Sequence, residues 1–191
     1  SPVLIVEHDI DRVLGFSHEV TVMNQGEVLM TGTPEAVRAD RRVQEVYTGT
    51  GLPAVAHSPT LSPTRDAAPI LRFEAVNTFY GKSHILNNVS FTLHENEIIA
   101  LLGRNGAGKS ALLKTLIGIA PAASGAIELA GDELAGLSSA EHARLGIGYV
   151  PQGRGLFAGM SVAQNLELGG LKRQTGNGVH WSLERIYEYF P

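Results

Sequence analysis

The chain has 191 residues, 43% of them hydrophobic and 18% charged, with a formal net charge of −4 at pH 7 and no cysteine. This balance is typical of a folded globular protein, and the net charge argues against nucleic acid as a partner. The lack of cysteine excludes disulfide bonds and thiolate metal sites. The longest apolar runs fall far short of the roughly 20 residues that cross a bilayer, and no signal peptide opens the chain, so we expect membrane association only through a partner.

The first stretch, residues 1–48, begins with strand patterns. Val3–Val6 is an uninterrupted apolar run, typical of a strand buried on both faces of a parallel sheet. Val20–Met23 and Glu27–Met30 flank Asn24-Gln25-Gly26, which predicts a hairpin at a sheet edge with Gly26 at positive φ.

Two helices and a linker are expected next. Thr33 as N-cap, followed by Pro34, predicts a short helix, and a second helix is expected over Arg41–Tyr47. Residues 49–69 hold four of the chain's nine prolines and show no sustained periodicity. Proline blocks helices and central strands, so this stretch is predicted to be a semi-extended linker between two units.

The second stretch, residues 70–191, is predicted to be α/β. Ile70–Val76 and Val89–Leu93 alternate as antiparallel strands do, and Ile98–Leu102 is a continuous apolar strand. A glycine-rich turn and an amphipathic helix follow it, the helix having one apolar face formed by Leu112, Leu113, Leu116 and Ile117. Further strands are expected at Ala126–Leu129 and Ile147–Val150, and further helices near Ser139–Leu145, Ser161–Leu168 and Leu183–Phe190.

The segment Gly103–Ser110 matches the phosphate-loop pattern G-x-x-x-x-G-K-[ST], and it lies between a buried strand and an amphipathic helix as that pattern requires. Its glycines let backbone N–H groups face a phosphate at the positive end of the helix. Lys109 is expected to reach the β- and γ-phosphates, and Ser110 to offer its hydroxyl to Mg²⁺. The alternative is a glycine-rich turn with a surface lysine.

Two short segments around this loop carry a family resemblance. Phe79–Lys82 lies upstream and Gly148–Gln152 lies downstream, and with the loop they resemble the ATP-binding cassette (ABC) family. The resemblance implies that Tyr80 stacks on adenine and that Gln152, on the Q-loop, contacts Mg²⁺ and the attacking water. The alternatives are a tyrosine at a strand end and an exposed loop glutamine.

The first stretch resembles the opposite end of the same kind of subunit. Val3–Asp9 matches the strand that ends in the family's switch histidine, and Gly26–Val37 matches the tail that follows it. The resemblance implies that His8 contacts the γ-phosphate; the alternative is a histidine that caps a strand end.

The resemblance therefore implies ATP and Mg²⁺ as cofactors and gives a set of candidate site residues. His8 and Gln152 are the catalytic candidates, and Ser110 and Gln152 are the metal candidates. The nucleotide-binding candidates are Tyr80 and the loop with the residue after it: Gly103, Arg104, Asn105, Gly106, Ala107, Gly108, Lys109, Ser110 and Ala111.

The expected organisation is that of two incomplete cassettes. Residues 1–48 would be the C-terminal remnant of a first ABC ATPase, 49–69 the linker, and 70–191 the N-terminal half of a second, up to the start of its helical subdomain. The fold class is thus an incomplete P-loop NTPase core with an antiparallel β-subdomain. We further expect residues 3–8 to pair with Ile98–Leu102, either within the chain or across a strand-swapped dimer.

Two family motifs are not found in this sequence. One is the glycine-rich signature, because Leu168-Gly169-Gly170 lacks its serine; the other is an apolar strand ending in Asp-Glu, because Asp132-Glu133 follows Gly131. Loss of a general base typically costs about 10²- to 10⁴-fold in rate. The resemblance implies a parent protein in which two cassettes are fused in one polypeptide, and we expect that parent to be an ATP hydrolase. We expect this chain to bind ATP weakly and to hydrolyse little of it.

The sequence most resembles the ATPase subunits of branched-chain amino-acid importers. The resemblance implies a cytoplasmic protein, peripheral on the inner face of the plasma membrane. Its partners would be transmembrane permease subunits and a second ABC ATPase domain, with a homodimer or strand-swapped dimer as a further assembly. The alternatives are a nucleotide-binding or interaction module that does not hydrolyse ATP, an ATPase of another ABC system such as lipopolysaccharide export, and a phosphoryl-transfer kinase.

Overall fold

Two four-stranded sheets dominate the computed structural model, which describes residues 2–7, 13, 15–47, 67–153, 155–170 and 182–190. The chain divides into two compact units, Ser1–His142 and Ala143–Pro191, and both sheets lie in the first. The predicted linker lies outside the described residues except for its last three. Its role as a boundary between two cassettes stays a prediction.

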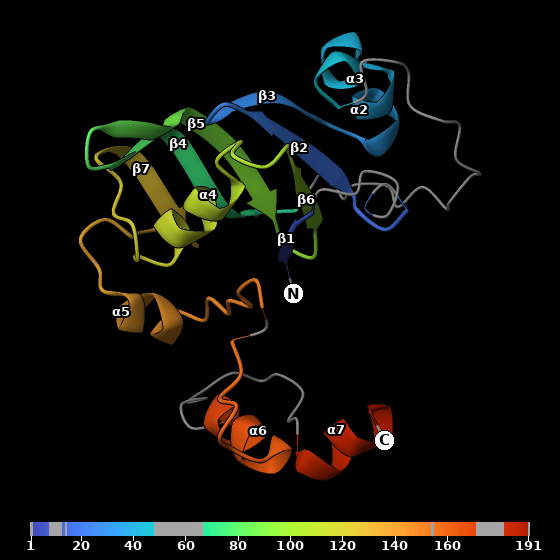
Figure 1. The fold of residues 1–191 in the computed structure, drawn as a ribbon, viewed down its shortest axis with the longest axis vertical. Coiled ribbons are helices and arrows are strands. Elements are labelled where there is room, and N and C mark those ends of the chain that lie inside the picture. Colours follow the sequence, from blue (N-terminus) through green and yellow to red (C-terminus); the bar gives the residue numbers. More distant parts are fainter. Residues whose placement is uncertain are drawn as a thin grey trace. The chain divides into compact units, whose positions relative to one another are not determined.

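The first sheet joins strands from two parts of the first unit that are far apart in the sequence, in the order β1-β6-β2-β3 (Figure 1). Its members are β1 (Val3–Val6), β6 (Ile98–Leu102), β2 (Glu19–Asn24) and β3 (Glu27–Gly32). The central strand β6 runs parallel to both neighbours, with Val3 opposite Ile98 and Val22 opposite Leu102. The expected pairing of the first strand with Ile98–Leu102 is therefore present within one chain.

The hairpin and the helices of the first stretch follow the sequence prediction closely. Strands β2 and β3 are antiparallel, and the turn between them has Gln25 at φ 50° and Gly26 at φ 85°. Helix α2 (Pro34–Ala39) has Thr33 as its N-cap, whose side chain accepts a hydrogen bond from the Ala36 N–H at 3.3 Å. Helix α3 (Arg41–Tyr47) follows.

The second sheet is antiparallel and has the order β5-β4-β7-β8. It contains β4 (Pro69–Tyr80), β5 (Ser83–His94), β7 (Ser124–Leu129) and the short β8 (Asp132–Glu133). Strands β4 and β5 extend well beyond the predicted Ile70–Val76 and Val89–Leu93. Register shifts interrupt their pairing, and Ala75 and Asn88 have positive φ there, so the apolar alternation breaks although the strands continue.

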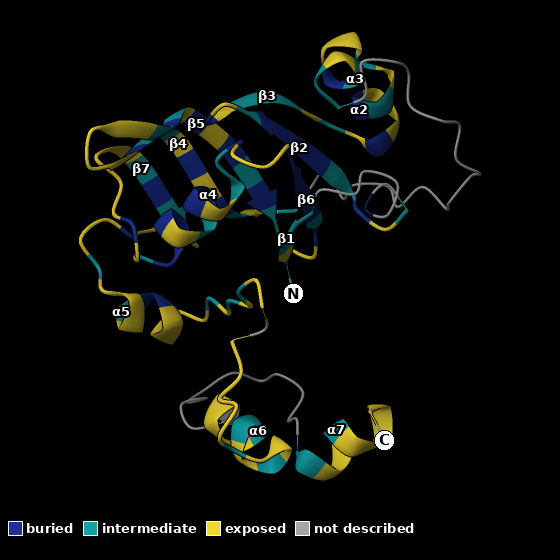
Figure 2. Ribbon diagram, in the orientation of Figure 1, coloured by how far each residue is buried: buried dark blue, intermediate teal, exposed yellow. Residues whose placement is uncertain are grey.

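The core of the first sheet is built from the first stretch of the chain and from β6. One buried cluster joins residues of the first stretch to Ala100 and Leu102 of β6; its other members are Val13, Val20, Val22, Val37 and Val43. Figure 2 shows β2 and β6 mostly buried, as expected for strands with a neighbour on each side. The second sheet has its own stacked pair, Phe73 and Phe91, with ring centroids 4.7 Å apart. Burial of the apolar run of β6 thus depends on residues that precede it by between 57 and 89 positions in the sequence.

One predicted strand is wrong. Ile147–Val150 has no regular secondary structure, and Val150 is 83% exposed. A strand needs a neighbour for its backbone hydrogen bonds, and none of the strands in the described ranges pairs with this segment. Three predicted helices are present as α5 (Ser139–Arg144), α6 (Val162–Gly170) and α7 (Leu183–Tyr189). Within the parts of the chain described here, no helix has the length and apolar character needed to cross a membrane.

A pH-dependent contribution to stability is expected from Glu19 at the start of β2. Burial, and then the charge of Glu97, raise the pKa of the Glu19 carboxyl, which His94 partly offsets. A raised pKa means that the folded state favours the protonated acid, so stability falls as the pH rises from the ordinary value toward the raised one. We expect Glu19→Gln to raise the melting temperature at pH 7, with a smaller gain at pH 4. Equal gains at both pH values in thermal unfolding would contradict this.

Candidate functional site

The loop between β6 and α4 (Lys109–Leu116) is shaped by glycines that other residues could not replace. A Cβ on Gly103 would lie 2.7 Å from the carbonyl oxygen of Met23 and 2.9 Å from the Cβ of Ala107. Gly106 and Gly108 have φ of 87° and 101°, which favours glycine. The loop therefore curls tightly where the strand ends and the helix begins.

The helix that follows the loop starts without a side-chain cap. Gly108 is the N-cap, and as a glycine it has no side chain to accept a hydrogen bond from the first turn. The N–H groups of this turn belong to Lys109, Ser110 and Ala111, and they lie at the positive end of the helix dipole. No atom lies within 4 Å of the position that a Cβ on Gly106 would take, so the loop is open there. This arrangement of free N–H donors beside open space fits a phosphate group.

Lys109 lies across the loop. Its Nζ donates to the carbonyl oxygens of Gly103 at 2.5 Å and Arg104 at 3.1 Å. Partial burial lowers the pKa of the ammonium. Phosphate oxygens carry charge and are stronger acceptors than carbonyls, so a phosphate in the loop would compete well for these N–H donors.

Helix α4 is held in place from two sides. The hydroxyls of Thr78 on β4 and Thr115 on α4 form a buried hydrogen bond of 3.1 Å, in which either can donate. In the same last turn of the helix, the Nδ1 of the buried His142 hydrogen-bonds the carbonyl oxygen of Leu116 at 2.6 Å. These contacts fix the direction of the helix whose first turn forms part of the site.

The threonine pair gives a stability prediction. Thr115→Val would leave the buried Thr78 hydroxyl without its partner, which typically costs about 1–3 kcal/mol. In the double variant Thr78→Val with Thr115→Val neither hydroxyl remains, so we expect the loss to be smaller. Urea unfolding of both variants measures this difference, and a double variant less stable than Thr115→Val would contradict it.

The turn of the β2–β3 hairpin also contacts the loop, which the sequence did not reveal. The Gly26 N–H donates to the carbonyl oxygen of Ala107 at 3.0 Å, and the Gly26 carbonyl accepts from the Asn87 N–H at 2.8 Å. The positive φ of Gly26 was predicted correctly, but its partners were not. The one available signal was the implied pairing of residues 3–8 with β6, which brings the first stretch to this side of the loop.

The remaining candidate residues, Tyr80, Gln152 and His8, lie outside the phosphate loop. Tyr80 ends β4, is 44% exposed, and lies beside a stacked pair formed by Phe79 and His84, whose ring centroids are 4.3 Å apart. Gln152 belongs to the second unit and is exposed. His8 lies outside the described residues. The roles of these three residues stay predictions.

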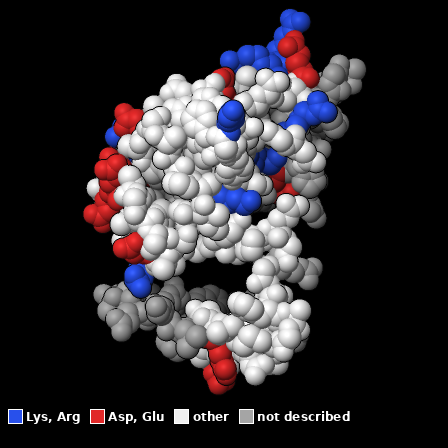
Figure 3. All heavy atoms as spheres, turned by 60° about the vertical axis from the view of Figure 1, so that its left-hand side comes forward, with Lys and Arg blue, Asp and Glu red and all other residues white. Residues whose placement is uncertain are grey.

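Figure 3 shows one face of the molecule on which most of the surface is uncharged, and on this face Lys and Arg lie in several separate places.

Comparison with known families places the loop in context. The family model described as "ABC transporter" matches residues 86–190, and the one described as "Branched-chain amino acid ATP-binding cassette transporter" matches residues 27–52. The first match lies within the second stretch of the chain, and the second match covers the later half of the first stretch and the start of the predicted linker.

Three similar proteins illustrate the sequence identity and the share of each chain that is matched. It is 42% identical over 122 residues to the high-affinity branched-chain amino acid transport ATP-binding protein BraG of Pseudomonas aeruginosa, covering 64% of this chain and 52% of BraG. It is 46% identical over 100 residues to the galactofuranose transporter ATP-binding protein YtfR of Escherichia coli, covering 52% of this chain and 20% of YtfR. A solved ATP-binding subunit of an ABC transporter is 28% identical with a TM-score of 0.46, covering 55% of this chain and 44% of that one. The chain thus spans about half the length of BraG and less of the others.

Proposed function

Because the chain belongs to the ABC transporter family, whose model matches residues 86–190 of its 191, we propose that it binds Mg-ATP through the loop Gly103–Ser110. The observation that carries this proposal is the open glycine loop at an uncapped helix N-terminus, with the Lys109 ammonium lying across it.

Each loop element has a role in this proposal. The N–H groups of the loop and the first turn of α4 bind the β-phosphate, and Lys109 binds the β- and γ-phosphates. Ser110 offers its hydroxyl to Mg²⁺, which commonly keeps few protein ligands beside the substrate phosphates. Tyr80, exposed at the end of β4, stacks on adenine. His8 is proposed to contact the γ-phosphate, and Gln152 is proposed to contact Mg²⁺ and the attacking water.

We propose that hydrolysis by this chain is slow. Asp132 and Glu133 are exposed and form a two-residue strand at the edge of the antiparallel sheet, away from the strands that flank the loop. They are thus poorly placed to act as a general base at the γ-phosphate, a role that typically contributes about 10²- to 10⁴-fold to the rate.

Nucleotide competition tests the binding proposal. The chain is titrated with a fluorescent ATP analogue in the presence of Mg²⁺, and ATP, ADP and AMP are added as competitors while phosphate release is followed. We expect saturable binding, displacement by ATP and ADP but hardly by AMP, which has no β-phosphate, and release near background. Equal competition by AMP would show that the loop is not the site, and sustained release would refute slow hydrolysis.

The longer protein is proposed to energise the import of branched-chain or related amino acids. The match of residues 27–52 and the likeness to BraG support this class of cargo. The partners would be transmembrane permease subunits and a second ABC ATPase domain, in a homodimer or otherwise, at the cytoplasmic face of the plasma membrane. Deletion of the gene should reduce uptake of labelled leucine but not of ribose. Unchanged leucine uptake would favour another ABC system, or a module that binds nucleotide without hydrolysing it.

A further inference from the structure

The turn of the β2–β3 hairpin lies between the phosphate loop and β5. Through its N–H, Gly26 donates to the carbonyl oxygen of Ala107 at 3.0 Å, and through its carbonyl it accepts from the Asn87 N–H at 2.8 Å. One residue of the first stretch therefore joins two segments that lie about 60 and 80 positions further along the sequence.

Contact at this point is too close for a side chain. Gly26 has φ 85°, and a Cβ there would overlap the carbonyl oxygen of Ile85. A Cβ on Gly108 would lie 3.3 Å from the Cα of Gly26 and 3.2 Å from the Ile85 carbonyl oxygen. The two glycines thus let the backbones of the turn, the loop and β5 meet.

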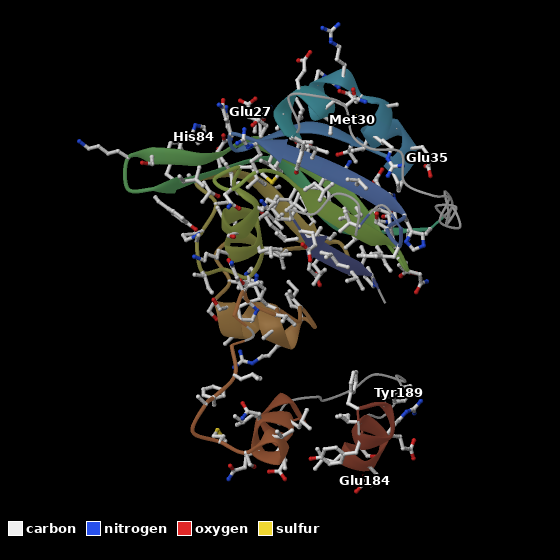
Figure 4. The ribbon with its side chains drawn as sticks, turned by 45° about the vertical axis from the view of Figure 1, so that its right-hand side comes forward. Glu27, Met30, Glu35, His84, Glu184 and Tyr189 are labelled. Atoms are coloured by element: carbon white, nitrogen blue, oxygen red, sulfur yellow. The ribbon has the colours of Figure 1, made fainter. Side chains whose placement is uncertain are left out.

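A second link holds the turn against β5. The Asn87 side-chain amide donates to the Glu27 carboxylate, next to the backbone bond between Asn87 and Gly26. Figure 4 labels Glu27 at the turn end of β3, His84 of β5, and Met30 and Glu35 further along the chain from Glu27. Neither Glu27 nor Asn87 is buried, so both can be changed without opening the core.

The hydrogen bond to Ala107 orients a peptide group of the loop. In a trans peptide the C=O of one residue and the N–H of the next point in opposite directions. Holding the Ala107 carbonyl toward Gly26 therefore directs the Gly108 N–H away from the hairpin. Gly108 caps α4, where a phosphate would be bound.

From this geometry we propose that Gly26 is a positioning residue for the phosphate loop, and that the Glu27–Asn87 pair clamps its turn against β5. The inference rests on the proposed nucleotide binding. It adds that the affinity for the phosphates depends on a hairpin in the first stretch of the chain, remote in sequence from the loop itself.

Gly26→Ala tests the backbone contact, with Gly131→Ala as its control. Gly131 lies in the turn between β7 and β8 with φ 90°, and no atom lies within 4 Å of its Cβ position, so it carries similar backbone strain without the loop contact. We expect Gly26→Ala to weaken Mg-ATP binding about three- to tenfold, as for loss of one hydrogen bond, and Gly131→Ala to leave it unchanged. In the nucleotide-free protein, the amide chemical shift of Gly108 should move only in Gly26→Ala.

A charge exchange tests the clamp if Gly26→Ala fails to fold. Asn87→Asp places a second carboxylate opposite Glu27 and should weaken Mg-ATP binding, whereas Asn87→Asp combined with Glu27→Gln restores a donor–acceptor pair and the original net charge, and should restore affinity. The control Asn88→Asp adds the same charge one residue away, at φ 51°, which aspartate tolerates.

The outcomes separate the two proposals. Wild-type affinity and an unmoved Gly108 amide in both Gly26→Ala and Asn87→Asp would overturn the positioning role. An equal loss in Asn87→Asp and Asn88→Asp, without rescue by Glu27→Gln, would also overturn it, because the added charge alone would then be responsible. If the wild-type chain binds no nucleotide, the proposed function fails, and the Gly108 amide shift still decides whether Gly26 orients the loop.

Discussion

Lys109→Ala is expected to weaken Mg-ATP binding by about ten- to a hundredfold, the largest effect on affinity that we predict for a single substitution. The ammonium lies across the loop and donates to two of its carbonyl oxygens, so it is already on the side where phosphate oxygens would be bound. Hydrogen bonds to charged groups are worth about 1.5–3 kcal/mol, which corresponds to this range of affinity. Competition titration with the fluorescent ATP analogue measures the change.

A second lysine on the same helix provides the matched control for this substitution. Lys114 is exposed in the last turn of α4, so Lys114→Ala removes the same charge without touching the loop. We expect this variant to bind Mg-ATP as the wild type does. Equal affinity of Lys109→Ala and the wild type, with both proteins folded, would show that the nucleotide is bound elsewhere or without this ammonium.

Leu102→Ala is expected to lower the free energy of unfolding by about 2–5 kcal/mol. Leu102 is fully buried at the end of β6, and it belongs to the cluster that also contains Val22 of β2. This loss is large against the roughly 5–15 kcal/mol by which folded proteins are stable. Ile119 is 59% exposed, and Ile119→Ala should change stability by no more than about 0.5 kcal/mol.

The partner residue on β2 turns this prediction into a test of the shared core. Val22 and Leu102 are opposite each other in parallel strands and point to the same face. The effects of Val22→Ala and Leu102→Ala should therefore be non-additive by about 0.5–3 kcal/mol in urea unfolding. Strict additivity would mean that the two stretches do not share this core in solution.

Local signals in the sequence were sufficient for most elements. The apolar run Ile98–Leu102, the hairpin around Gly26 and the N-cap Thr33 each depend on neighbouring residues, and all three are found where predicted. The phosphate loop could also be predicted from the sequence, because its glycines and Lys109 all lie within eight consecutive residues. Local patterns could thus give the α/β class and the position of the loop between β6 and α4, whereas its role in binding nucleotide stays a prediction.

The failures arise where structure depends on distant partners. Ile147–Val150 has the apolar character of a strand, but a strand also needs a neighbour, and pattern alone does not supply one. Strands β4 and β5 continue past bulges that break the alternation used to bound them. The contact of Gly26 with Ala107 joins residues 81 positions apart, and no local pattern encodes it.

The central claim is that β1 and β6, which are more than 90 positions apart in the sequence, lie side by side in one chain next to the phosphate loop. The chain has no cysteine, so a pair introduced by Val3→Cys and Ile98→Cys reports on this pairing alone. Neighbouring strands lie about 4.7–4.9 Å apart, which is within the Cα separation that a disulfide spans. In the control pair, Val3→Cys lies on β1 and Glu133→Cys lies on β8 of the other sheet.

Mild oxidation followed by non-reducing electrophoresis is the most direct measurement. We predict that the Val3→Cys, Ile98→Cys variant forms a disulfide within the monomer, seen as a faster-migrating monomer band that reducing agent abolishes, and that the control pair does not. Disulfides only between chains would indicate a strand-swapped dimer. That result, or the absence of any disulfide in the folded protein, would contradict the proposal that the two stretches form one sheet within a single chain.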